Sequence, residues 1–156
     1  NDVYFVACGD GEDCNLIKDA TKNNSKIIYL GIVPYAEMPG LIANSIAGLS
    51  IQNNLGNRSD TGLSPLKVYE TLACGVPVIV TDFPGQADLV NKGNCGIVIP
   101  PDNPLALAQA VNYLSLNLNE RLAMGKRGRE IVEREHSWDK RAYDTDVIIR
   151  SVLNII

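Results

Sequence analysis

The sequence predicts an α/β domain of the doubly wound, Rossmann-like class, in which helices cover both faces of a parallel sheet. Two observations lead to this prediction. Short apolar runs typical of strands buried in a parallel sheet occur at residues 3–7, 27–31, 76–80 and 96–99. Between them lie longer segments with helical spacing, and this alternation is the pattern of consecutive βαβ units. A length of 156 residues fits one domain spanning residues 1–156.

The first third of the chain alternates between strand and helix signals. Residues 3–7 form the first predicted strand, and Gly9-Asp10-Gly11 permits a tight turn after it. The predicted elements that follow are a helix at 13–22, a strand at 27–31, a helix at 38–46 and a less apolar strand at 47–51.

A polar loop is predicted for residues 52–62, and a helix begins after it. Ser64 is placed at the N-cap and Pro65 at the first helical position, the two residue types preferred there. The helix runs to about residue 74, and Gly75 ends it.

The remainder holds two strands and then only helix. Residues 76–80 are the most strand-like segment of the chain, and 96–99 form one more strand. Asn103-Pro104 begins a helix, and apolar side chains follow it at helical spacing. We expect helical structure from there to the end.

Composition and charge exclude several classes of function. The formal net charge is −4, from 14 basic and 18 acidic residues, so no broad basic surface for nucleic acid is predicted. A local positive pocket for a diphosphate is compatible with this net charge. The cysteines form no CxxC pair and none has a neighbouring histidine, so neither a zinc site nor a thioredoxin motif is predicted. A reducing, cytoplasmic compartment fits these cysteines best.

In open parallel sheets the ligand binds at the carboxyl ends of the strands, so the loops after the strands are the candidate sites. Gly9-Asp10-Gly11 lacks the third glycine of a dinucleotide fingerprint and, taken alone, is better explained as an ordinary turn. Residues 62–65 deliver backbone amides to a helix start, where an anion such as phosphate is favoured, but an ordinary helix cap also explains them. Lys67 and Glu70 have the spacing of a surface ion pair.

Residues 64–82, with the sequence SPLKVYETLACGVPVIVTD, are followed by Pro84-Gly85-Gln86. This stretch closely resembles the signature of glycosyltransferase family four, the group-1 glycosyltransferases. Further matching segments follow in family order at residues 9–11, 30–34, 96–101 and 136–138. The resemblance covers nearly the whole chain and implies the C-terminal, donor-binding half of a two-domain GT-B enzyme.

The resemblance also implies roles for individual residues. Glu70 matches the second glutamate of the family's pair, which holds the ribose hydroxyls of the donor nucleotide. Residues 62–64 match the loop whose amides approach the donor diphosphate, and Val33 matches the position whose backbone contacts the base. No catalytic residue is assigned. The predicted donor-binding residues are Gly9, Gly11, Val33, Gly62, Leu63, Ser64, Lys67 and Glu70.

The chain departs from the family pattern in two respects. The first glutamate of the pair should stand at position 62, where this chain has Gly62, with Asp60 two residues earlier. The family's N-terminal acceptor domain and the opening strand, whose Arg and Lys clamp the diphosphate, have no match in these residues. We therefore expect a fragment that does not transfer sugar by itself and that self-associates through exposed edges. His136, the one histidine, is interpreted as a surface or packing residue.

The function implied by the resemblance is donor binding in a retaining glycosyltransferase of the hexosyltransferase class, within polysaccharide biosynthesis. The expected substrate is a UDP- or GDP-type nucleotide sugar, with a carbohydrate or lipid-linked acceptor and with neither cofactor nor metal. The expected partners are the enzyme's own N-terminal domain and, through that domain, the inner face of the membrane.

Two alternatives remain. The first is a non-catalytic α/β module that binds a nucleotide or a protein, which the glycine at position 62 favours. The second is a response-regulator-like or flavodoxin-like domain. That domain would need an acidic cluster or flavin loops at the strand ends, and Asp10 with Asp82 is too small a set.

Overall fold

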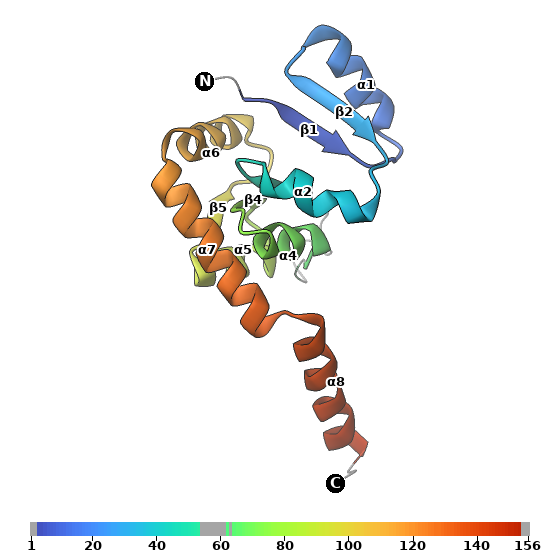
Figure 1. Ribbon diagram of the computed structural model, residues 1–156, viewed down its shortest axis with the longest axis vertical. Coiled ribbons are helices and arrows are strands. Elements are labelled where there is room, and N and C mark those ends of the chain that lie inside the picture. The colour runs from blue at the N-terminus through green and yellow to red at the C-terminus, as the bar shows by residue number, and fades with distance from the viewer. Residues whose placement is uncertain (1–2, 54–61, 63, 154–156) are drawn as a thin grey trace. The chain divides into compact units, whose positions relative to one another are not determined.

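The computed structural model describes residues 3–53, 62 and 64–153 of an α/β protein whose paired strands are all parallel (Figure 1). The chain divides into two compact units, Asn1–Leu41 and Ile42–Ile156. Five strands form two sheets in the described part of the chain, one in each unit, with the orders β1-β2 and β3-β4-β5. The predicted alternation of strands and helices is confirmed.

The first unit is a single βαβ arrangement followed by a short helical segment. β1 pairs with β2 from Phe5 beside Ile27 to Cys8 beside Gly31, and α1 packs against β2. Since α1 begins directly after Asp13, the helix predicted over 13–22 is confirmed. The elements are β1 (Phe5–Cys8), α1 (Cys14–Asn23), β2 (Ile27–Gly31), the 3₁₀ helix η1 (Tyr35–Glu37) and α2 (Met38–Ala43), which crosses the unit boundary.

The prediction that the first two strands are buried is wrong. Phe5 is 45% exposed and Leu30 is 46% exposed, and none of the described side chains of the first unit is fully buried. An apolar run shows that a strand can be buried, but burial also requires other elements on both faces of the sheet. Within this unit α1 packs against β2.

The second unit is built on a three-stranded parallel sheet with β4 at its centre. Val78 pairs with Gly48 on one side and with Gly96 on the other, and every residue of β4 is buried. The elements are β3 (Gly48–Ser50), α4 (Leu66–Ala73), β4 (Val78–Thr81), α5 (Gln86–Gly93), β5 (Gly96–Ile99), α6 (Pro104–Leu116), α7 (Leu118–Glu135) and α8 (Trp138–Leu153).

Helices cover both faces of this sheet, as predicted. Val78 and Val80 point into an apolar cluster shared with α4, α5 and the end of α7. Ile79, on the opposite face of β4, packs with α6 and with Met124 from the first half of α7. The alternation of side chains along β4 therefore divides the core of the second unit into two layers.

Several predicted boundaries are confirmed. β5 spans the four predicted residues, and Asn103 Oδ1 accepts a hydrogen bond of 2.9 Å from the Ala106 amide, which caps α6. Gly75 follows the last residues of α4 with a φ of +73°, the left-handed conformation that suits a glycine at this position.

Other boundaries differ from the prediction. Ser64 does not cap α4, because the N-cap is Pro65, in an extended conformation, and no side chain bonds to the first amides. The predicted helix over 38–46 is shorter, since α2 ends at Ala43. α5, a short and largely polar helix, was not predicted. Its signal was Asp88, whose carboxylate accepts a 2.8 Å hydrogen bond from the Gly85 amide at the helix start.

The chain ends in two long helices separated at His136 and Ser137. α7 packs on α4, α5 and α6, whereas α8 contacts α7 and has no buried side chain in its described length (Figure 1). The helical structure predicted for this part of the chain is confirmed for the described residues, with a break at His136 and Ser137. A search of the described residues finds no helix with the length and apolar character needed to cross a membrane.

Candidate functional site

The first unit brings two of the predicted regions together at the carboxyl edge of its sheet. β1 and β2 end side by side, and the Gly9 amide donates a 2.7 Å hydrogen bond to the Gly31 carbonyl. The Tyr29 hydroxyl donates to the Gly9 carbonyl at 2.9 Å. Gly9 has a φ of +119°, which an L-residue adopts only with strain. The loop containing Gly9 and Gly11 is thus anchored to β2, which leads directly to Val33.

The second unit places Gly62 beside the turn that follows β4, and the other predicted residues that the structure describes lie at the start of α4 or along it. Gly62 is exposed and has a φ of +96°, and a Cβ built on it would lie 3.7 Å from the Pro84 carbonyl oxygen, in the turn after β4. Ser64 and Lys67 are exposed around the start of α4, and Glu70 is half-buried one turn further along. Leu63 lies outside the described residues.

A buried polar cluster lies beneath this turn. Gln86, the first residue of α5, is fully buried together with Ser50 and Thr81, the last residues of β3 and β4. The Gln86 amide nitrogen donates to the Thr81 carbonyl at 2.8 Å and to Thr81 Oγ1 at 3.0 Å. The Ser50 hydroxyl donates to Gln86 Oε1 at 2.9 Å. In the sequence Gln86 stands out only as the end of the motif Pro84-Gly85-Gln86, and no role was predicted for it.

Gln52 lies next to this cluster at the carboxyl end of β3. Its backbone amide donates to Thr81 Oγ1 at 3.2 Å. Within the described residues, its side-chain oxygen Oε1 is the one buried side-chain polar atom without a hydrogen-bond partner. Because a buried acceptor without a donor is costly, this oxygen is the polar atom of the region best prepared to accept a new hydrogen bond.

His136 packs against α4 on the residue that precedes Glu70. Its ring lies 5.1 Å from the ring of Tyr69 in an edge-on arrangement, and Arg141 Nη2 donates to His136 Nδ1 at 3.0 Å. Burial, with the nearby Arg141 charge, lowers the pKa of His136 below its usual 6.5. This arrangement agrees with the interpretation of His136 as a packing residue.

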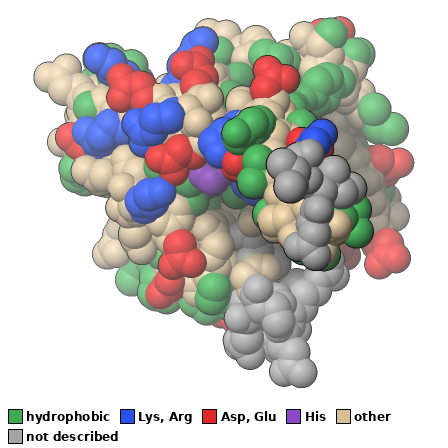
Figure 2. Space-filling view, turned by 90° about the horizontal axis from the view of Figure 1, so that it is seen from below, with side chains coloured by type: hydrophobic (Ala, Val, Ile, Leu, Met, Phe, Trp, Pro, Cys, Tyr) green, Lys and Arg blue, Asp and Glu red, His purple; other side chains and the backbone are tan. Residues whose placement is uncertain are grey.

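The charged surface of the second unit is finely mixed. Figure 2 shows basic and acidic side chains interspersed around the histidine. Ion pairs join Lys92 to Glu135, Arg127 to Glu120 and Arg129 to Glu133. Among the residues that the structure describes, no three His, Cys, Asp or Glu side chains are grouped as a metal site would require.

Comparisons with known proteins place this geometry in context. Residues 1–131 match the family described as Glycosyl transferases group 1. The GDP-mannose-dependent monoacylated alpha-(1-6)-phosphatidylinositol monomannoside mannosyltransferase of Corynebacterium glutamicum is 29% identical over 140 residues. That match covers 88% of this chain and 36% of the mannosyltransferase, so the chain spans little more than a third of this relative.

Solved structures show the same fold. HepE of Anabaena, crystallised with UDP, has a TM-score of 0.77 at 17% identity, and the match covers 96% of this chain and 41% of HepE. The C-terminal domain of a glycosyl transferase group 1 family protein of Francisella tularensis has a TM-score of 0.66 at 16% identity, over 83% of this chain and 66% of that domain. The predicted α/β fold of the C-terminal half of a GT-B glycosyltransferase is confirmed. The protein belongs to the group 1 glycosyl transferases.

Proposed function

We propose that the chain is the donor-binding domain of a retaining glycosyltransferase of family four. The observation that carries this proposal is the left-handed backbone of Gly62, held beside the turn after β4 and just before α4. Backbone amides at the start of a helix favour an anion such as a diphosphate. Membership of the group 1 family supports the proposal, as do the structures of HepE with UDP and with UDP-glucose.

Each predicted residue has a physical role in this proposal. The Glu70 carboxylate accepts hydrogen bonds from the two ribose hydroxyls, and the Val33 backbone bonds to the base. Amides near Gly62 and Ser64 approach the diphosphate, and the exposed ammonium of Lys67 adds a positive charge at the start of α4. Gly9 and Gly11 contribute a loop at the strand ends of the first unit.

The proposed chemistry is hexosyl transfer to a carbohydrate or lipid-linked acceptor, within cytoplasmic polysaccharide biosynthesis. In this scheme the departing diphosphate accepts the acceptor's proton, and the chain's residues orient the donor and stabilise the charge on the phosphates. The acceptor is held by the N-terminal domain of the full-length enzyme. Both UDP and GDP remain donor candidates, because HepE binds UDP whereas the Corynebacterium relative is GDP-mannose-dependent.

A second candidate is a nucleotide-binding module without transferase activity. It is favoured by Gly62, which stands where the family resemblance leads us to expect an acid that contacts the donor sugar. Sugar transfer by the full-length parent, assayed beside nucleotide binding, separates the two candidates. Binding without any turnover of donor would support the module.

The ribose contact of Glu70 provides the direct test of donor binding. We expect the chain to bind UDP or GDP more tightly than the 2′-deoxy analogue, and Glu70→Ala to remove this preference. A hydrogen bond to a charged group contributes about 1.5–3 kcal/mol, so the expected loss is about tenfold to a hundredfold. Isothermal titration calorimetry with the two nucleotides and their deoxy forms measures it.

Glu130→Ala on α7 is the matched control, since Glu130 is an exposed glutamate paired with Lys126. This variant should keep the preference for ribose. Equal affinity of the unaltered chain for the ribose and deoxyribose forms would contradict the assigned role of Glu70. Failure to bind any of these nucleotides would contradict the proposed function.

A further inference from the structure

Gln86 connects the ends of two strands through one buried amide group. Its side chain is 1% exposed, and its nitrogen donates to the Thr81 carbonyl at 2.8 Å and to the Ser50 carbonyl at 3.4 Å. Its oxygen accepts from the Ser50 hydroxyl at 2.9 Å. The amide thus fixes the carboxyl end of β3 relative to that of β4, close to where each strand leaves the sheet.

The same amide also fixes the turn between β4 and α5. The Thr81 carbonyl, which accepts from Gln86, accepts a second hydrogen bond of 2.8 Å from the Phe83 amide. The Asp82 amide donates to the Ile99 carbonyl at 2.8 Å, which ties the turn to β5. Pro84 and Gly85 follow at once, so their backbone positions depend on these bonds.

Pro84 in turn lies beside Gly62. A Cβ on Gly62 would be in van der Waals contact with the Pro84 carbonyl oxygen, at 3.7 Å. A displacement of the turn would therefore move the Pro84 carbonyl relative to the Gly62 backbone beside it. The Gln86 amide donates to the Thr81 carbonyl and accepts from the Ser50 hydroxyl. An apolar side chain of the same length can do neither, so both groups would lose a hydrogen bond.

We infer that Gln86 is a positioning residue that holds the turn at residues 82–85, and through it the Gly62 backbone, in the geometry that receives the donor diphosphate. This inference rests on the proposed function. Gln86 acts through the turn and touches no ligand. Its loss should reduce binding of the second phosphate more than binding of the nucleoside and first phosphate.

The test is Gln86→Met in the full chain, because methionine keeps the length and shape of glutamine without its hydrogen bonds. The affinities for UDP, UMP, GDP and GMP are measured by calorimetry. We expect about tenfold weaker diphosphate binding, with monophosphate binding little changed, so that the ratio of the two affinities falls. Ser50→Ala removes one bond to the amide and should shift the ratio in the same direction by less.

Gln109→Met is the matched control, since Gln109 is an exposed glutamine on α6, and it should leave the ratio unchanged. An unchanged ratio in Gln86→Met, when the unaltered chain binds diphosphates, overturns the role of Gln86 and leaves the proposed function intact. Equal weakening of mono- and diphosphate binding, with a lower melting temperature, also overturns it, because that result marks a purely structural residue. If the unaltered chain binds no diphosphate, the proposed function itself is contradicted.

Discussion

Gly125 of α7 lies directly against the Gly75 carbonyl oxygen, and a Cβ built on Gly125 would stand 1.9 Å from that oxygen. Backbone therefore packs on backbone where α7 crosses the end of α4. Gly125→Ala should force the two helices apart and lower the free energy of unfolding by about 1–3 kcal/mol, the usual cost of overpacking. Urea unfolding followed by circular dichroism measures this change.

Gly40→Ala is the control for that substitution. Gly40 lies within α2, has no positive φ, and its added Cβ would meet no heavy atom within 4 Å. Because alanine is the better helix former, this variant should be neutral or more stable by up to about 1 kcal/mol. Similar losses in the two variants would show that the contact with Gly75 is not the cause.

Gly62→Ala should affect ligand binding more than it affects stability. Keeping a φ of +96° would cost an L-residue about 1–3 kcal/mol, so the exposed alanine should relax to a different backbone conformation at this position. Since Gly62 is exposed, the melting temperature should fall little, whereas the affinity for UDP or GDP should fall up to about tenfold. Calorimetry and thermal melting of the same sample separate these effects, and undiminished affinity would count against a diphosphate contact here.

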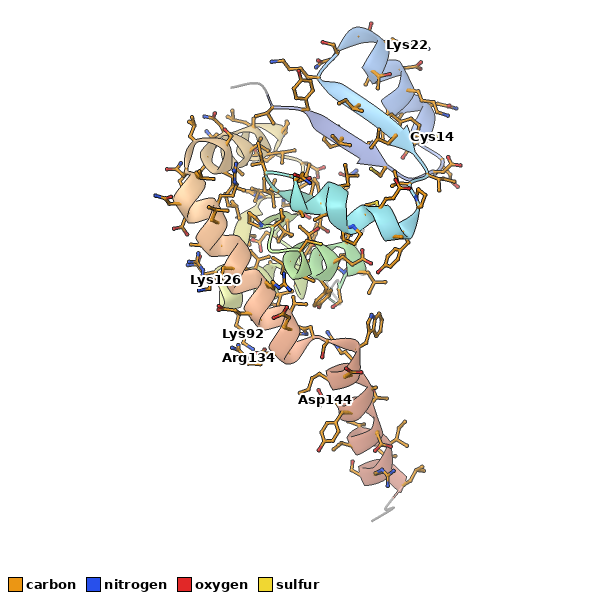
Figure 3. All side chains as sticks on the ribbon, in the orientation of Figure 1. Cys14, Lys22, Lys92, Lys126, Arg134 and Asp144 are labelled. Atoms are coloured by element: carbon orange, nitrogen blue, oxygen red, sulfur yellow. The ribbon has the colours of Figure 1, made fainter. Side chains whose placement is uncertain are left out.

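Glu135 should give the fold an acid-dependent stability. The hydrogen bonds from Lys92, at 2.8 Å, and from Arg134 lower the pKa of Glu135 from 4.5 to about 2 (Figure 3). Because the folded pKa is the lower one, the carboxylate stabilises the fold above about pH 4.5, and this contribution is lost as the pH falls towards about 2. Lys92→Met removes the largest cause and should raise the pKa of Glu135.

Carboxyl NMR titration of the two proteins measures this pKa, and urea unfolding across the same range of pH should show a flatter profile in Lys92→Met. Lys126→Met is the control, since the Lys126 ammonium lies 3.9 Å from the carboxylate of Glu130, a different glutamate on the same helix. An unchanged Glu135 pKa in Lys92→Met would assign the shift to Arg134 alone.

The sequence predicted the start of a helix correctly where a capping side chain and a proline lie within its first turn. Asn103 and Pro104 mark the start of α6 because a side-chain oxygen and a fixed φ act within one turn. The prediction that Ser64 is the N-cap of α4 was wrong by one residue. Pro65, the next residue, adopts an extended conformation and is itself the N-cap. Local pattern identifies a helix start to within about two residues.

Burial and long-range polar contacts could not be predicted in this way. β1 and β2 are apolar runs like β4, yet of these three strands only β4 has helices packed on both of its faces within its unit. Ser50 and Gln86 are 36 residues apart, and no local pattern shows that their side chains bond. For the candidate site, the sequence supplied the residues around Gly62 through the family resemblance but not the buried amide beneath them.

The absence of buried side chains among the described residues of the first unit has a consequence for hydrogen exchange. Amide protons exchange with solvent through openings whose free energy depends on how much apolar contact each opening disrupts. Small local openings suffice to expose the amides of β1 and β2, whereas those of β4 exchange only when two packed layers separate. The amides of β1 and β2, the strands that lead to Gly9 and Val33, should therefore exchange well before those of β4, the strand that leads to the turn beside Gly62.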